Sequence, residues 1–173
     1  MKNKSNHGIK EYQHLSHEFG PLYDSASRTL ILGSFPSVKS REAQFYYGHP
    51  QNRFWKVLAA LYEEKVPAVK EEKIHFVLGH HLALWDVIES CDISGSSDAS
   101  IRNAVPADLS SILAKTEINR IFINGKTAFR LYEKYQKDKT GMEAVCLPST
   151  SPANAAWSLE RLVDAWKIIR YEE

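Results

Sequence analysis

Four short apolar runs, separated by segments with helical spacing, most constrain the fold of this 173-residue chain. The runs cover residues 29–32, 82–85, 120–123 and 144–147, and they do not alternate between apolar and polar side chains. Unalternating strands are typical of a parallel sheet that is covered on both faces. Because strands that alternate with helices form crossover units, we predict an α/β fold with three layers, α/β/α. Its centre would be a mainly parallel sheet of four strands.

The covering helices are predicted from apolar residues at three- and four-residue spacing. We expect them near residues 54–62, 69–78, 106–113, 128–135 and 159–169. Pro106 suits the first turn of the third helix, because its missing N–H would have no partner there. Residues 1–27 are polar and weakly patterned, so we interpret them as an N-terminal arm ahead of one domain over residues 28–173.

Composition argues against several classes of protein. The two cysteines, Cys91 and Cys146, stand far apart, and the seven histidines show no metal-ligand spacing. We therefore expect neither a disulfide framework nor a metal site. The N-terminus is polar, and no run approaches the roughly 18 apolar residues of a membrane span, so we expect a cytoplasmic protein without membrane contact. With a net charge of +1, any nucleic-acid binding would depend on a local basic patch.

Turn-forming or polar residues follow all four predicted strands. The strands end at the segments 33–37, 85–86, 124–125 and 148–152. In an open parallel sheet, ligands bind in the crevice outside the carboxyl ends of the strands. Any one of these ends could be an ordinary turn, but the four together favour a single binding site.

Two of these segments belong to a set of four motifs. The chain carries, in order, GSFPS at 33–37, YYGHPQNRFW at 46–55, ALWDV at 83–87 and LPSTSPA at 147–153. The set resembles the uracil-DNA glycosylase superfamily, and most of all its hypoxanthine-DNA glycosylase branch (family six). The mismatch-specific uracil-DNA glycosylase branch shares H-P-x-N-R-F-W in full. The resemblance covers residues 28–169.

The resemblance implies a monofunctional DNA glycosylase of base excision repair, free of cofactor and metal. Such an enzyme flips a deaminated base out of double- or single-stranded DNA and hydrolyses its N-glycosidic bond. Hypoxanthine is the first candidate base. A uracil-directed enzyme of the same superfamily and a catalytically silent nucleic-acid-binding homologue are the alternatives. We expect a monomer.

The catalytic group is predicted from a departure in the first motif. Most of the superfamily places there an Asn or Asp that orients the attacking water, whereas this chain has Phe35. The resemblance to family six implies Asn52 in its place. An Asn at the head of a helix is also a common N-cap, so Asn52 has a structural alternative. His49 is the second catalytic candidate, although before Pro50 it could serve only to order the loop.

The remaining site residues follow from the same motifs. Phe35 could stack on the flipped base or belong to the core, and Asp86 could accept the N1–H of hypoxanthine or form a cap or salt bridge. The residues assigned to the base pocket are Gly33, Ser34, Phe35, Pro36, Tyr46, Tyr47, Trp85, Asp86 and Asn124. The residues assigned to DNA binding are Arg53 and a late loop of Ser149, Thr150, Ser151, Pro152, Ala153 and Asn154, with Pro152 and Ala153 as the wedge that fills the vacated stack.

Overall fold

Four parallel strands form the central sheet of the computed structural model, which describes residues 11–95 and 97–170. They are β2 (Thr29–Gly33), β3 (Leu82–Asp86), β6 (Arg120–Asn124) and β7 (Ala144–Leu147), in the order β3-β2-β6-β7. All three pairings are parallel. Every residue of β2 and β3 is buried, which explains why these runs do not alternate. The predicted parallel sheet is confirmed.

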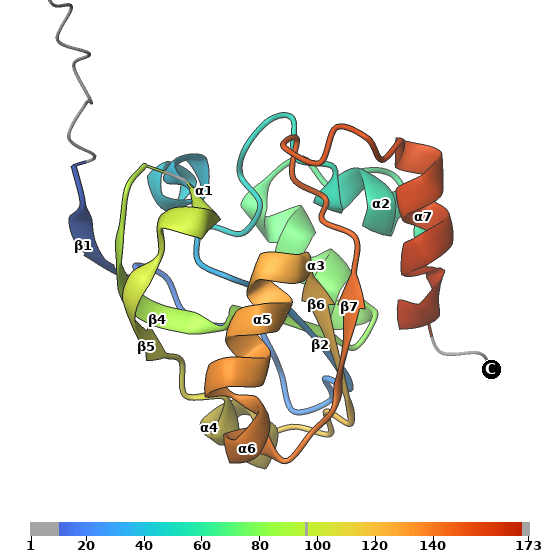
Figure 1. The fold of residues 1–173 in the computed structure, drawn as a ribbon. Helices are drawn as coiled ribbons and strands as arrows, with labels where there is room; N and C mark the ends of the chain where they lie inside the picture. Colours follow the sequence, from blue (N-terminus) through green and yellow to red (C-terminus); the bar gives the residue numbers. More distant parts are fainter. Residues whose placement is uncertain (1–10, 96, 171–173) are drawn as a thin grey trace, which may run out of the picture.

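Helices cover both faces of this sheet, as the three-layer prediction requires (Figure 1). Figure 1 shows α5 in front of the strands and α3 behind them, and α2 packs against α7. The helices are α1 (Val38–Ala43), α2 (Phe54–Leu61), α3 (Lys70–Gly79), α4 (Leu109–Ala114), α5 (Lys126–Tyr135), α6 (Lys137–Thr140) and α7 (Leu159–Trp166). Short 3₁₀ turns cover Asp98–Ser100 and Lys167–Ile169. No helix within the described ranges is long and apolar enough to cross a membrane.

A second, antiparallel sheet was not predicted. It contains β1 (Gln13–Ser16), β4 (Ile88–Ile93) and β5 (Arg102–Pro106), in the order β1-β4-β5. The stretch interpreted as an N-terminal arm therefore contributes a strand, and its first ten residues lie outside the described ranges. Leu22 also bridges to Leu84 of the central sheet. The later part of the arm thus packs on the domain.

The position of Pro106 was predicted wrongly. This residue ends β5 instead of starting a helix, and α4 begins three residues later at Leu109. The cap is Asp108, whose carboxylate accepts the backbone N–H of Ser111 at 3.1 Å. Because β5 lies at the edge of its sheet, a proline there removes no essential hydrogen bond of the ladder.

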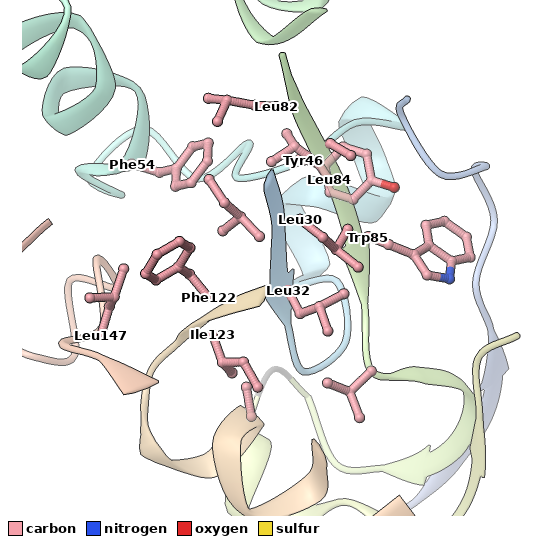
Figure 2. Packing of buried hydrophobic residues seen from close by; sticks show 14 of the residues in the cluster. Leu30, Leu32, Tyr46, Phe54, Leu82, Leu84, Trp85, Phe122, Ile123 and Leu147 are labelled. Atoms are coloured by element: carbon pink, nitrogen blue, oxygen red, sulfur yellow. The ribbon is translucent and has the colours of Figure 1, made fainter. Parts of the chain in front are cut away.

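The core lies between the central sheet and its helices. Figure 2 shows the side chains of Leu30 and Leu32 of β2 close to those of neighbouring strands and of α2, which contributes Phe54. Trp166 of α7 is fully buried, and its indole Nε1–H donates to the carbonyl of Pro148 at 2.9 Å. The last helix therefore holds the segment that follows β7 against the core.

Candidate active site at the carboxyl ends of the parallel strands

A cavity of about 130 Å³ opens at the carboxyl ends of the four parallel strands. An engineered cavity of roughly 150 Å³ holds benzene, so this volume suits one ring-sized group. The cavity is lined by Phe19, Gly33, Ser34, Phe35, Pro36, Ser37, Ser40, Tyr46, Tyr47, Asn52, Asp86, Ile93, Asp98, Asn124, Ser149, Thr150 and Ser151. The segments after all four strands contribute to it.

The structure brings together most, but not all, of the predicted site residues. Of the predicted base-pocket residues, only Trp85 is missing from the lining, and Asn52 and three residues of the late loop are part of it. His49, Arg53, Pro152, Ala153 and Asn154 do not line the cavity. The lining residues Phe19, Ser40, Ile93 and Asp98 were not predicted. No three His, Cys, Asp or Glu side chains within the described ranges are arranged to hold a metal ion.

The Asn52 side chain is fixed by a chain of hydrogen bonds. The Asn124 amide donates to the Thr150 hydroxyl at 2.9 Å, and that hydroxyl donates to Asn52 Oδ1 at 2.9 Å. The backbone N–H of Phe54 donates to the same oxygen at 2.9 Å. A backbone N–H can only donate, so the atom that faces it must be the amide oxygen. Two donors thus occupy Oδ1, and the NH₂ group is the end that remains for a substrate or water.

The hydrogen bond from the Phe54 N–H, at the first residue of α2, is also the kind of contact that a helix-capping role of Asn52 predicts. Asn52 lines the cavity at the same time. The two roles are therefore compatible in one side chain, because the oxygen of its amide makes the cap-like contact while the side chain lines the cavity.

Arg53 binds the late loop. Its guanidinium donates to the carbonyls of Ser151 at 3.1 Å and Asn154 at 3.0 Å, and also to the carbonyl of Trp157. Its backbone N–H donates to the carbonyl of Thr150 at 3.0 Å. Two motifs about a hundred residues apart in the chain are thereby joined beside the cavity. Arg53, which we assigned to DNA, has its guanidinium engaged within the protein.

The rest of the late loop divides into an inner and an outer part. Ser149, Thr150 and Ser151 line the cavity, and the Asn154 amide donates back to the carbonyl of Ser149 at 3.0 Å. Ala153 is exposed at the outside of the loop. The two residues predicted as a wedge, Pro152 and Ala153, therefore lie outside the cavity.

His49 orders its own turn. Its Nδ1 atom accepts the backbone N–H of Gln51 at 3.1 Å, and its side chain lies outside the cavity. This is the contact expected of the loop-ordering alternative. The catalytic assignment of His49 gains no support from this geometry.

Two tyrosines, Tyr46 and Tyr47, line the same cavity as the buried carboxylate of Asp86. Burial raises the pKa of Tyr46 and of Tyr47, and the nearby charge of Asp86 raises both further, so both phenols keep their protons. Tyr46 donates its hydroxyl to the carbonyl of Gly20 at 2.8 Å. The Tyr47 hydroxyl is buried close to the Asn124 amide, but it forms no hydrogen bond of good geometry within the described ranges. It is a donor that a bound base could satisfy.

A second carboxyl group, on Asp98, also lines the cavity. Burial raises its pKa to about 6, and the charge of Asp86 adds to this, although a hydrogen bond with Ser34 acts in the opposite direction. Asp98 lies in the turn between β4 and β5, outside every motif that the sequence offered.

The raised pKa of Asp98 predicts a pH-dependent stability. In the unfolded chain the pKa of an aspartate is about 3.9, so the folded state binds the proton of Asp98 more tightly. The free energy of unfolding should therefore fall as pH rises from about 4 to about 6. Asp98→Asn has no carboxyl group and should not show this loss of stability. Relative to the unmodified protein, its free energy of unfolding should rise by about 1–2 kcal/mol more at pH 7.5 than at pH 4.5. Urea unfolding of both proteins at the two pH values measures this.

Asp92→Asn is the matched control. The Asp92 pKa is lowered, first by a hydrogen bond from Asn103 and then by one from His14, so its substitution should give no such gain at pH 7.5. If the change in unfolding free energy for Asp98→Asn were the same at both pH values, the Asp98 carboxyl would ionise in the folded state without loss of stability.

Comparison with known proteins agrees with this fold. A family profile described as "Uracil DNA glycosylase superfamily" matches residues 21–171. The chain belongs to the uracil DNA glycosylase superfamily, and the predicted resemblance is confirmed.

Individual relatives give a narrower comparison. A protein of Methanosarcina acetivorans named hypoxanthine DNA glycosylase is 33% identical over 145 residues, covering 83% of this chain and 90% of the relative. A protein of the same name from Methanosarcina barkeri is 29% identical over 150 residues, covering 86% of this chain and 93% of the relative. A solution NMR structure from Methanosarcina acetivorans, described as a candidate uracil DNA glycosylase, has a TM-score of 0.75 at 31% identity and covers 88% of this chain and 94% of that one.

Proposed function

We propose that this DNA glycosylase removes hypoxanthine from DNA, by flipping the deoxyinosine nucleotide into the cavity and hydrolysing its N-glycosidic bond. The observation that carries the proposal is a cavity at the carboxyl ends of the parallel strands, lined by a buried carboxylate, Asp86, and by the amide side chain of Asn52. The names of two relatives that cover most of the chain support the choice of base. We further propose that it acts as a monomer, on double- or single-stranded DNA, without a cofactor or metal.

Base recognition is assigned to Asp86 and Tyr47. Hypoxanthine carries a ring N–H beside a carbonyl, so it needs one acceptor and one donor along that edge. The Asp86 carboxylate is an acceptor, and the Tyr47 hydroxyl is a donor without a good partner within the described ranges. Phe35 is 6% exposed and lines the cavity, which suits an apolar face against which the base could stack.

Bond cleavage is assigned to Asn52. Negative charge builds on the base as the glycosidic bond breaks, and the sugar becomes oxocarbenium-like. Because the Asn52 oxygen already accepts two hydrogen bonds, its NH₂ group is the end that can hold the attacking water or the departing base. An amide is too weak a base to take the proton of water, so Asn52 would act by orientation and hydrogen bonding.

The first test is a glycosylase assay on defined duplexes. Purified protein is incubated in EDTA with duplexes that carry deoxyinosine, deoxyuridine or deoxyxanthosine, and each sample is divided before alkali treatment. We expect alkali-dependent strand breaks at deoxyinosine and none before alkali, because a monofunctional enzyme leaves an intact abasic strand.

Each of the other outcomes would support a different function or mechanism. Faster breakage at deoxyuridine would identify the uracil-directed alternative. A requirement for metal, or a covalent adduct trapped by borohydride, would contradict direct hydrolysis, since the latter indicates a Schiff base. Binding without breaks on any substrate would identify the silent homologue.

A further inference from the structure

His17, from the segment before the central sheet, makes a short contact with the base-facing carboxylate. Its backbone follows β1, and its backbone N–H donates to the carbonyl of Glu89 at 2.7 Å, which continues the pairing of β1 with β4. Its side chain is 1% exposed. The ring centroid lies 4.2 Å from that of Trp85, 4.6 Å from that of Phe19 and 5.9 Å from that of Phe35. Figure 2 shows the Trp85 ring pointing away from β2. The imidazole is therefore held among aromatic rings.

The only polar partner that holds this ring within the described ranges is Asp86. Nε2 of His17 lies 2.6 Å from Oδ2 of Asp86, whose side chain is 7% exposed. Nδ1 of His17 is buried without a partner within the same ranges. A buried N–H without an acceptor is costly, so the geometry places the proton on Nε2, where it is donated to Asp86. One carboxylate oxygen is thus occupied by His17.

The other oxygen of Asp86 is directed at the floor of the cavity. A Cβ atom added to Gly33 would lie 2.6 Å from Asp86 Oδ1 and 3.3 Å from the Tyr47 hydroxyl. Both groups therefore converge on the space that the missing side chain of Gly33 leaves open. With Oδ2 held by His17, the carboxylate cannot rotate without breaking a buried hydrogen bond.

We propose that His17 is a positioning residue of the base pocket, which fixes Asp86 so that Oδ1 accepts a ring N–H of a deaminated base. The proposal rests on the function proposed above and adds the rule by which the base is chosen. Deamination converts a ring nitrogen that accepts a hydrogen bond, N1 of adenine or N3 of cytosine, into a ring N–H. Adenine or cytosine would point the lone pair of this ring nitrogen at a fixed carboxylate, so the pocket disfavours these two bases by repulsion. Guanine and thymine already carry a ring N–H, and this contact does not exclude them.

The test compares two substrates that differ only at this position. Single-turnover rates are measured on duplexes that carry deoxyinosine or its N1-methyl derivative, which has no ring N–H. His17→Phe keeps an aromatic ring but cannot donate to Asp86. We expect the rate on deoxyinosine to fall at least about tenfold and the preference over the methylated base to narrow by a similar factor, because charge-assisted hydrogen bonds are among the stronger ones. His17→Gln, which can donate from a similar distance, should restore most of the preference.

His14→Phe is the matched control. His14 lies on β1 and contacts Asp92 at 2.9 Å through a similar pair, but its side chain is 65% exposed, and neither His14 nor Asp92 lines the cavity. Its substitution should leave both rates unchanged. A folded His17→Phe protein with an unchanged preference, or with equal losses on both substrates, would overturn the positioning role.

Asp86→Asn decides the matter if His17→Phe does not fold. His17 would then hold the amide oxygen and turn the NH₂ group toward the base, so the preference for a ring N–H should collapse while binding to an abasic product stays normal. A retained preference would overturn the proposal. Inactivity of the unmodified protein on deoxyinosine would instead overturn the proposed function, which these variants do not test.

Discussion

Asn52→Ala is expected to lower the single-turnover rate on deoxyinosine by at least about a hundredfold, with little change in DNA affinity. The factor corresponds to about 2.7 kcal/mol of barrier, the usual size for one preorganised hydrogen-bond donor. Because the substitution also removes the acceptor of the Phe54 N–H, we expect a loss of unfolding free energy of about 1 kcal/mol. Quench-flow or manual single-turnover kinetics at saturating enzyme measure the first effect, and thermal melts measure the second.

Asn52→Asp separates catalysis from capping. An aspartate keeps an oxygen for Phe54 and for the Thr150 hydroxyl, but it has no N–H to donate and adds a negative charge beside the departing base. Stability should remain close to that of the unmodified protein, while the rate should fall at least as far as in Asn52→Ala. A stable and active Asn52→Asp enzyme would show that catalysis requires the side-chain oxygen of Asn52 and not its NH₂ group.

Replacing Pro152 and Ala153 together by glycine should slow excision from a duplex at least about tenfold and from single-stranded DNA much less. The two residues do not line the cavity, and Ala153 is exposed to solvent. We predict that they form the wedge that fills the vacated stack. Their removal should then affect the flipping step, whose cost of a few kcal/mol arises from unpairing and unstacking in the duplex. The measurement needs one deoxyinosine oligonucleotide, with and without its complement.

The matched control changes Ala155 and Ala156, which are exposed directly after the late loop, to glycine. This variant also adds backbone freedom next to the site and should keep both rates. Equal losses on the two substrates for the Pro152 and Ala153 variant, at unchanged melting temperature, would place these residues in direct contact with the base or sugar.

The central sheet was predictable because burial on both faces leaves a clear pattern in each strand. β2, for example, is buried at every position. The antiparallel sheet was not predictable from the sequence. Its strand β1 is polar and mostly exposed, and its strand β4 has only every second or third residue buried. Such strands depend on pairing between distant segments, and neither carries a local signal strong enough to separate it from a loop.

The candidate site was predictable where a motif carried it. The loop after β2, Asn52 and the inner part of the late loop all line the cavity. His17 and Asp98 were missed because nothing in their neighbouring residues marks them. Asp98 is brought to the cavity by the turn between β4 and β5, and His17 is brought to Asp86 by the pairing of β1 with β4. Trp85 was placed in the pocket because it stands, like Asp86, at the end of a predicted strand, but successive residues of a strand point to opposite faces.

The clamp that Arg53 forms on the carbonyls of residues 151, 154 and 157 has a consequence for biosynthesis. The oxygen of Asn52 is likewise oriented by Thr150, so the first half of the chain holds an incomplete site until the last segments arrive. Contacts of such long sequence separation form late in folding. On a nascent chain the site therefore stays incomplete until the late loop and α7 have left the ribosome and docked on the earlier part of the fold.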